Sequence, residues 1–528
     1  MRNEPSSIHR DTAAAFAAPS VPLHARSAVL LRCGLPLTVV ALLACNADSD
    51  GGGSGSTSAE AETEIGSGTG TPGSTSGVDP SSSDGGPSSS DGSSTPGAAD
   101  TTDTGTASED STDDGGSSTG EPVPPPMTTA SIETKNARTC ILLARGAVRC
   151  WGWNVNGRLG YGHTEDIGDD EVPATAGDVP LGGTVTQLSV GTNHACVVLE
   201  GGDVRCWGLG TYGRLGYGNT ETIGDNETPD SQAPVNVGGT VVAVAAAAFH
   251  TCALLEDGAV RCWGDNEFHQ LGHPELNDFA IGDNEDPAVL GDVDIGGTVV
   301  EIAAGGNSTC ALLDTGNVRC WGGSFHDPDG FPFFTPLGYG GLGYVGDDET
   351  PASVGDLSLG GTATQIAVAE RHRCAILQGG TLRCWGLGSL GILGYGNGND
   401  IGDDELPEAA GDVPVGENIV QVETGSRTTC VVTDVGNVRC WGWSTVGALG
   451  YGNLDPVGLT NPASAGGDVS VGGPVAQVST GGGSTCALLQ NDDVVCWGTG
   501  FAGTLGYGNV EDIGDDELPS SAGTVQYQ

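Results

Sequence analysis

The sequence predicts an all-β fold, a seven-bladed β-propeller, because one short motif recurs seven times at nearly constant spacing. The stretch HTCALLEDGAVRCWG (250–264) has near-copies that start at Arg138, His194, Ser308, His372, Thr428 and Ser484. The first cysteines of successive copies are 56, 56, 58, 64, 56 and 56 residues apart. Repeats of this length pack only on their neighbours, so we expect one large repeat domain.

Each copy predicts a β-hairpin, because two apolar runs flank a turn centred on Asp257. A three-residue loop, 256–258, places Cys252 opposite Cys262 and favours glycine at its last position. Six copies have glycine there, and the seventh has Asp492. Alternation along the strands makes the two cysteines a non-hydrogen-bonded pair, with Cα atoms about 4.5 Å apart. That separation lies in the range of a disulfide.

Seven disulfides are therefore expected, each within one hairpin. Reduced core cysteines and a metal site are the alternatives, although zinc usually takes cysteines two to four residues apart. The predicted pairs are Cys140–Cys150, Cys196–Cys206, Cys252–Cys262, Cys310–Cys320, Cys374–Cys384, Cys430–Cys440 and Cys486–Cys496.

Four strands are expected in each blade. A strand of small and β-branched residues, such as 185–188, precedes the hairpin and suits a crowded ring axis, and a weak strand, such as 177–181, follows it. The tryptophan after each second cysteine is expected in the core between blades. The predicted blades are approximately 128–182, 183–238, 239–296, 297–360, 361–416, 417–472 and 473–528.

Residues 1–45 predict export. Arg26 and Arg32 precede the apolar run Leu35–Ala44, which is too short to span a membrane. The run ends in Leu-Leu-Ala-Cys at Cys45 and resembles a bacterial lipoprotein signal, which implies cleavage before Cys45 and lipid on its sulfur. An ordinary cleaved secretory signal is the alternative. Either signal takes the chain out of the cytoplasm and into an oxidising compartment, in which disulfides persist.

Residues 46–127 contain almost only Ser, Gly, Thr, Asp, Ala and Pro, which predicts a disordered linker. Such a linker spans roughly 50 Å as a flexible coil. The net charge is −50, and Lys135 is the single lysine. This balance argues against nucleic acid and anionic membrane surfaces as partners, because both need a basic patch. We expect contact with a membrane through the lipid anchor only.

The runs HTCALLEDGAVRCWGDNEFHQLG (250–272), HACVVLEGGDVRCWGLGTYGRLG (194–216) and RTCILLARGAVRCWGWNVNGRLG (138–160) resemble the repeat of the regulator of chromosome condensation (RCC1) family. The resemblance covers 128–528 and implies the propeller. The family's founder is a chromatin-bound guanine-nucleotide exchange factor, but an exported acidic chain meets neither nucleosomes nor cytosolic GTPases. Secreted propellers of this fold that inhibit β-lactamases imply instead that such a ring can be purely a protein binder.

No catalytic motif is found: the sequence has no nucleophile elbow, HExxH or phosphate loop. His194, His250 and His372 occupy one repeat position in different blades, so we interpret them as structural. Acidic loops recur in six blades; in the first the carboxylates are Asp166, Asp169, Asp170 and Glu171. Calcium is one interpretation of them and turn chemistry the other. No other cofactor is expected.

Blades three and four carry the irregular, aromatic loops. After its Trp-Gly, blade four inserts a segment with four of the nine phenylalanines, and blade three departs at the equivalent place. Equivalent loops of adjacent blades should meet on one face, where aromatic side chains would anchor a partner. The alternative is a cap that buries them. The candidate residues are Phe268, Phe279, Phe325, Phe331, Phe333 and Phe334.

The sequence thus predicts a non-enzymatic, surface-anchored, monomeric ring that binds a protein or a glycan through one face. An exported enzyme with its site in the central channel or the face loops is the rival interpretation, and a purely structural display protein is the third. Acid and base groups that converge on the axis would favour the enzyme, and exposed apolar groups would favour the binder.

Overall fold

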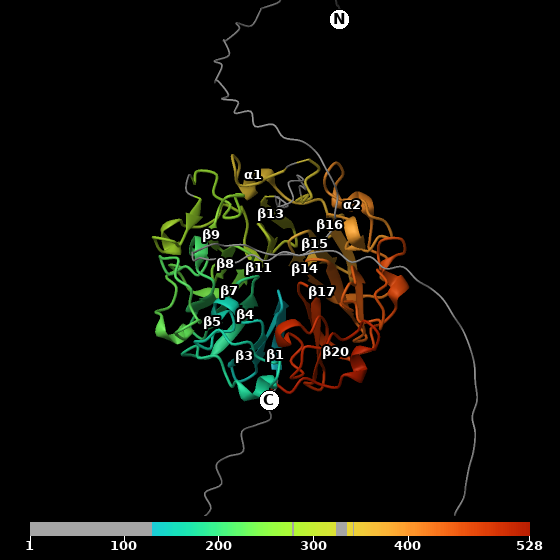
Figure 1. Ribbon diagram of the computed structural model, residues 1–528. Helices are drawn as coiled ribbons and strands as arrows, with labels where there is room; N and C mark the ends of the chain where they lie inside the picture. The colour runs from blue at the N-terminus through green and yellow to red at the C-terminus, as the bar shows by residue number, and fades with distance from the viewer. Residues whose placement is uncertain (1–128, 277–278, 324–334, 342) are drawn as a thin grey trace, which may run out of the picture. The chain divides into compact units, whose positions relative to one another are not determined.

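A computed structural model describes residues 129–276, 279–323, 335–341 and 343–528, which all belong to the unit Asp114–Gln528. These residues form seven antiparallel sheets in which the strands follow chain order. Figure 1 shows the sheets succeeding one another around a ring, from β1 to β20. The predicted seven-bladed all-β propeller is confirmed. The predicted signal (1–45, with Cys45) and linker (46–127) lie outside the described residues.

Three strands recur in each blade. The inner strands are β1 (Thr129–Lys135), β4 (Val185–Val190), β7 (Val241–Ala246), β11 (Val299–Gly305), β14 (Ala363–Val368), β17 (Ile419–Thr424) and β20 (Val475–Thr480). The second strands are β2 (Arg138–Leu143), β5 (His194–Leu199), β8 (His250–Leu255), β12 (Ser308–Leu313), β15 (His372–Leu377), β18 (Thr428–Thr433) and β21 (Ser484–Leu489). The third strands are β3 (Val148–Gly152), β6 (Val204–Gly208), β9 (Val260–Asp265), β13 (Val318–Gly322), β16 (Thr381–Gly386), β19 (Val438–Gly442) and β22 (Val494–Gly498).

Helical structure in the described residues is confined to single turns. One turn per blade starts at or directly after a proline, which has no N–H to leave unpaired there. These turns are η2 (Pro173–Thr175), η4 (Pro229–Ser231), η5 (Pro287–Val289), α1 (Pro351–Val354), α2 (Pro407–Ala410), η7 (Ala463–Gly466) and η9 (Pro519–Ser521). Others follow third strands: η1 (Val155–Gly157), η3 (Thr211–Gly213), η6 (Ser389–Gly391) and η8 (Phe501–Gly503). None of the described helices is long and apolar enough to cross a membrane.

The hairpins have the predicted register. Cys252 lies opposite Cys262, and the Leu255 N–H donates to the Ala259 carbonyl at 2.8 Å, which closes the three-residue loop. Gly258 has φ 84° and Asp492 has φ 69°, the left-handed conformation that this loop position requires. All seven predicted cysteine pairs lie at disulfide distance within their own hairpins, with Cα atoms 4.0 to 4.1 Å apart.

We expect non-reducing peptide mapping of the purified protein to recover seven intra-hairpin disulfides and no free thiol among these fourteen cysteines. Each bridge closes a loop with a sequence separation of 10 and should contribute about 2–3 kcal/mol to the free energy of unfolding. Bridges between blades, or alkylation of any of the fourteen in the native protein, would contradict the pairing.

The predicted fourth strand is wrong in position. The segment 177–181 makes one ladder contact, from the Val179 N–H to the Val148 carbonyl at 2.8 Å. The outermost pairing comes earlier, where Ile167 pairs with Gly152, and the same single bridge recurs in other blades. Among the described sheets, only the sheet of blade three has a fourth strand, β10 (Ala280–Ile281). In blade one, Pro180 has no N–H with which to continue a ladder. In blade two the later segment pairs once, through Val235 and Val204.

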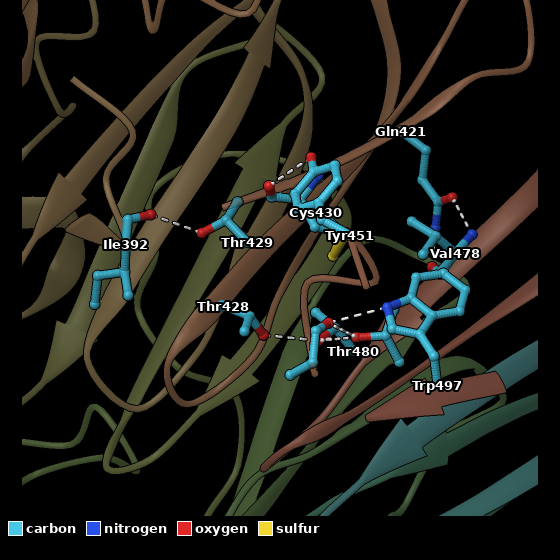
Figure 2. Close-up of a disulfide and its surroundings, with 12 residues drawn as sticks. Ile392, Gln421, Thr428, Thr429, Cys430, Tyr451, Val478, Thr480 and Trp497 are labelled. Carbon is cyan, nitrogen blue, oxygen red and sulfur yellow. Dashed lines mark hydrogen bonds between the residues drawn. A yellow bond between two sulfur atoms is a disulfide. The ribbon is translucent and has the colours of Figure 1, made fainter. Parts of the chain in front are cut away.

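Tryptophans form the contact between blades, as predicted. All seven are at most 1 % exposed, and each indole N–H donates to a backbone carbonyl of the preceding blade at 2.9 to 3.1 Å. The acceptors of Trp151, Trp207, Trp263, Trp321, Trp385, Trp441 and Trp497 are Thr504, Arg158, Arg214, Gln270, Leu337, Ile392 and Ala448. Figure 2 shows this packing around Cys430, with Trp497 and the bond from Thr429 to the Ile392 carbonyl.

The ring closes side by side, without strand exchange. β1 contacts β20, and Trp151 of the first blade donates to Thr504 of the last. Gln477 also brackets Ile132: its amide oxygen accepts from the Ile132 N–H at 3.0 Å, and its amide nitrogen donates to the Ile132 carbonyl at 3.1 Å. The same bracketing joins other neighbouring blades, for example Gln421 to Val478 in Figure 2. Closure therefore repeats the ordinary contact between neighbouring blades.

Candidate partner-binding face

One face of the ring carries both the mouth of the axial channel and the irregular loops. Because the strands are antiparallel, each third strand ends beside the turn that joins the first two. The loops after the Trp-Gly pairs therefore surround the end of the channel at Lys135 and Asn136. At that end all seven blades line one cavity of about 90 Å³, whose wall includes Lys135, Phe249 and Glu370. We call this side the loop face.

Three carboxylates lie on the inner strands that surround the ring axis. Glu133 lies on β1, Glu301 on β11 and Glu423 on β17, in blades that are not neighbours. Electrostatic interaction links Glu423 with both other glutamates and with Lys135, so the groups meet across the axis. The Lys135 ammonium group donates to the Thr424 carbonyl at 3.0 Å and to that of Thr480 at 3.4 Å. The single lysine is thus held at the mouth, above the carboxylates.

Burial changes the protonation of this cluster. Loss of solvent, with the repulsion of Glu423 added, raises the pKa of Glu133 to about 8, although Lys135 opposes the rise. Burial also raises the pKa of Glu301 to about 7, against a hydrogen bond from the Ile366 N–H that favours the charged form. The pKa of Glu423 is raised by burial as well. Burial therefore favours the neutral, protonated form of all three carboxyl groups.

Glu301 occupies a position at which other blades carry glutamine. The register of the inner strands aligns Glu301 with Gln187, Gln421 and Gln477. Each of these glutamines brackets the next blade through one accepted and one donated hydrogen bond. An ionised carboxylate reproduces only the accepted bond, here from the Ile366 N–H at 3.2 Å. Sequence reasoning missed these axial residues, although comparison of the inner strands blade by blade would have singled them out.

Aromatic side chains pair across blades around the mouth. Phe501 of blade seven meets Trp153 of blade one, with ring centroids 5.7 Å apart. Tyr212 of blade two meets Phe249 of blade three at 6.3 Å. Phe501 is 54 % exposed and Tyr212 50 % exposed. Exposed aromatic groups of this kind are typical of binding surfaces. These aromatic residues lie in loops of ordinary length, so loop irregularity did not predict them.

The expected meeting of the irregular loops of blades three and four stays a prediction, because 324–334 of the blade-four insert lie outside the described residues. A later part of blade four does approach blade three. The rings of His269 and Tyr344 lie 5.9 Å apart, edge to face. Phe268 is half-buried, whereas Phe279 is 77 % exposed. The other four candidates, Phe325, Phe331, Phe333 and Phe334, lie outside the described residues. Of the two described candidates, only Phe279 offers its ring freely to a partner.

Three of the four predicted calcium ligands come together. Oxygens of Asp169, Asp170 and Glu171 lie within 4.8 Å of one another, and the equivalent loops of blades four, five and seven form the same group. Asp166 does not join them, because its carboxylate accepts the Asn154 N–H at 2.7 Å. Burial, with the neighbouring aspartates, raises the pKa of Glu171. Asp166 thus follows the turn-chemistry interpretation, and calcium at the other three stays a prediction.

The three histidines have a structural role, as interpreted from the sequence, and the structure shows that they bridge blades. Each is fully buried and meets a threonine hydroxyl of the next blade: His194 with Thr251 at 2.8 Å, His250 with Thr309 at 2.7 Å, and His372 with Thr429 at 2.6 Å. Burial lowers the pKa of His250 and of His372 to about 3, so both are neutral over the usual pH range.

Comparison with known proteins agrees with the repeat pattern. One family model of the regulator of chromosome condensation (RCC1) repeat matches residues 185–214, 241–270, 299–326 and 419–448, and a second matches 201–254 and 257–312. The chain is 30 % identical over 398 residues to the ultraviolet-B receptor UVR8 of Arabidopsis thaliana. This match covers 74 % of this chain and 81 % of UVR8.

Solved structures share the fold at lower identity. Human WBSCR16 is 18 % identical, with a TM-score of 0.54, and the match covers 71 % of this chain and 92 % of that one. Yeast RCC1, solved bound to Kap60, is 19 % identical, with a TM-score of 0.54, and the match covers 76 % and 85 %. The seven matching blades, the family models and the similarity to UVR8 together show that this chain belongs to the RCC1 repeat family.

Proposed function

We propose that the ring binds a partner protein through the loop face and has no catalytic role of its own. The observation that carries this proposal is the set of aromatic contacts around the mouth, with Phe501 and Tyr212 half exposed. Among proteins of this family and fold, UVR8 is named a receptor and yeast RCC1 has been solved with Kap60 bound. A glycan is the alternative ligand, since sugars also stack on exposed aromatic rings. We further propose that the ring acts as a monomer.

Loss of loop-face aromatics should abolish partner capture without unfolding the ring. We expect Phe501→Ser, and the triple replacement of Phe331, Phe333 and Phe334 by serine, each to reduce capture from host surface extract about tenfold or more. The melting temperature of Phe501→Ser should stay within about 2 °C of the parent, since the exposed Phe501 side chain contributes little to stability. The triple variant should also keep its melting temperature if the blade-four segment binds the partner. Val435, which is 64 % exposed in the β18–β19 turn on the opposite face, provides the matched control Val435→Ser.

The control should capture the partner as the parent does. Equal capture by all loop-face variants would refute the proposed face. A fall in melting temperature for the triple variant, with capture intact, would instead assign the blade-four segment to a cap.

The proposal includes export and anchoring at the cell surface through Cys45. We expect Cys45→Ala to block signal processing and to move the protein from the detergent phase to the aqueous phase on phase separation, because one lipid-modified cysteine is the expected membrane attachment. Ser54→Ala, in the linker, serves as control. Unchanged detergent-phase recovery of Cys45→Ala would contradict lipidation and favour an ordinary secretory signal.

The axial carboxylates favour one second candidate, an exported enzyme. Burial raises the pKa of Glu133 to about 8 and that of Glu301 to about 7, as is useful in a general acid, and both residues lie on inner strands near the ring axis. The cavity at the channel mouth holds about 90 Å³, which suits a side chain or a small molecule better than a polymer. Binding remains our proposal because the exposed aromatics lie outside the channel.

A further inference from the structure

We infer that a groove between blades two and three of the loop face receives a lysine or arginine side chain of the partner protein. This inference rests on the proposed function, and names the chemistry of the contact. The groove has a volume of about 390 Å³ and is lined by Tyr212, Phe279, Asp283 and Glu285, with Thr220 and Asn284. It adjoins the channel mouth, since Tyr212 contacts Phe249 and Phe249 lines the mouth.

The fold does not require the two aromatic side chains of this groove. Tyr212 has φ 61°, and the equivalent turns of other blades place Asn156 at φ 59°, His269 at φ 61°, Leu390 at φ 67° and Ala502 at φ 53°, so the turn accepts side chains of several kinds. A left-handed backbone is costly for a bulky side chain and favourable for asparagine. Phe279 stands two residues before Ile281, where blades one and two carry glutamate and blade five carries asparagine. An exposed Tyr and an exposed Phe at such positions indicate a role outside folding.

The carboxylates of the groove lack cationic partners. Among the described residues, salt bridges join arginines to Asp178, Asp292, Asp356, Asp412, Asp468 and Glu417, and neither Asp283 nor Glu285 takes part in one. Asp283 accepts a hydrogen bond from the side chain of Asn284 at 3.2 Å, and Glu285 accepts one from the Gly282 N–H at 3.3 Å. Both carboxylates therefore keep free acceptor positions for a charged donor.

Arg214, the cation that contacts the Tyr212 ring, does not line the groove. Arg214 is buried, and its guanidinium group lies 5.6 Å from the Tyr212 ring centroid and donates to the Ala248 carbonyl and the Thr211 hydroxyl. The aromatic ring of Tyr212 therefore already packs against one cation, while half of the Tyr212 surface stays open to solvent.

Charge complementarity favours a basic side chain over a neutral sugar. The groove combines two exposed rings with two unpaired carboxylates, and cations bind both groups at once. The chain carries a net charge of −50, which draws cationic partners toward it. A neutral glycan would use the rings but leave both charges uncompensated.

The test uses the full chain and a fluorescein-labelled tri-arginine peptide, with fluorescence anisotropy in 50 mM and 500 mM NaCl. We expect binding at low salt that weakens about tenfold at high salt. Tyr212→Asn with Phe279→Asn should weaken binding about tenfold and keep or raise the melting temperature. Asp283→Asn with Glu285→Gln should also weaken it about tenfold. The matched control is Asp515→Asn with Glu517→Gln, which changes equivalent carboxylates in blade seven and should leave binding unchanged.

Three results would overturn the inference: no peptide binding, equal loss in the blade-seven control, or binding of neutral cello-oligosaccharides in place of the peptide. These failures can be told from failure of the proposed function. If Phe501→Ser abolishes partner capture while the peptide does not bind, the loop face is correct and the cationic contact is wrong. If the peptide binds as expected but every loop-face variant captures the partner normally, the groove stands and the proposed binding face fails.

Discussion

Replacing Trp151 with alanine is expected to lower the free energy of unfolding by about 3–5 kcal/mol, the largest effect of a single substitution that we expect. Trp151 is completely buried between the first and last blades, and its indole N–H donates to the Thr504 carbonyl at 3.0 Å. The substitution removes a large buried side chain and one inter-blade hydrogen bond where the ring closes. Neither neighbouring backbone can move in to fill the space, because both are held in their own sheets.

Chemical denaturation of the oxidised protein, followed by circular dichroism, measures this effect. Trp151→Phe keeps most of the buried surface and should cost about 1–2 kcal/mol for the lost hydrogen bond. Trp443→Phe, at a half-buried loop position, is the control and should change stability by less than about 1 kcal/mol. An effect of Trp151→Ala no larger than that of this control would show that closure does not depend on the indole.

The second expected result is that the ring loses stability as pH rises from about 4.5 to 8. Burial raises the pKa of Glu133 to about 8 and that of Glu301 to about 7, from the ordinary 4.5. The folded state therefore binds more protons than the unfolded state in this interval, and the free energy of unfolding falls with rising pH. We expect the two groups together to account for a loss of about 2–5 kcal/mol, reduced by water in the channel.

Glu301→Gln isolates one part of this effect. Glutamine cannot ionise, and it can both accept from the Ile366 N–H and donate to the Ile366 carbonyl, as Gln477 does with Ile132. We expect this variant to be more stable than the parent at pH 8 and nearly equal to it at pH 4.5, which flattens the pH profile. The reciprocal variant Gln187→Glu should lose stability at pH 8. Parallel pH profiles of Glu301→Gln and the parent would contradict the axial assignment. Melting temperatures across pH 4.5–8 supply the measurement.

Stability near neutral pH is thus set partly at the ring axis, whereas binding is proposed for the rim of the loop face. The two can be varied separately, because Glu301 is aligned with glutamines of other blades and Tyr212 is aligned with Asn156. In each case, the residue that other blades carry at the aligned position is a replacement that the fold accepts. Variants of this kind should change one property and leave the fold intact.

The amino-acid sequence by itself determined the hairpins, the pairing of the cysteines and the number of blades. The hairpins and the cysteine pairing follow from residues within about fifteen positions: the turn at 256–258 sets the register, and the register brings Cys252 opposite Cys262. The number of blades follows from the sevenfold recurrence of that motif. The burial of the seven tryptophans followed from alternation along a strand that has a blade on either side. Local geometry is sufficient for such features.

Only the tertiary structure decided which distant residues meet. The outermost pairing fell on Ile167 instead of 177–181, because the weak outer segments carry no strong strand signal of their own and Pro180 cannot donate. Glu133, Glu301 and Glu423 are spread over 290 positions, and they meet because the ring brings every inner strand to one axis. Likewise, Tyr212 and Phe279 share a groove although they belong to different blades, since neighbouring loops pack side by side. In a closed ring, residues that are far apart in the sequence lie close together at the axis and the rim, and short sequence patterns do not predict such contacts.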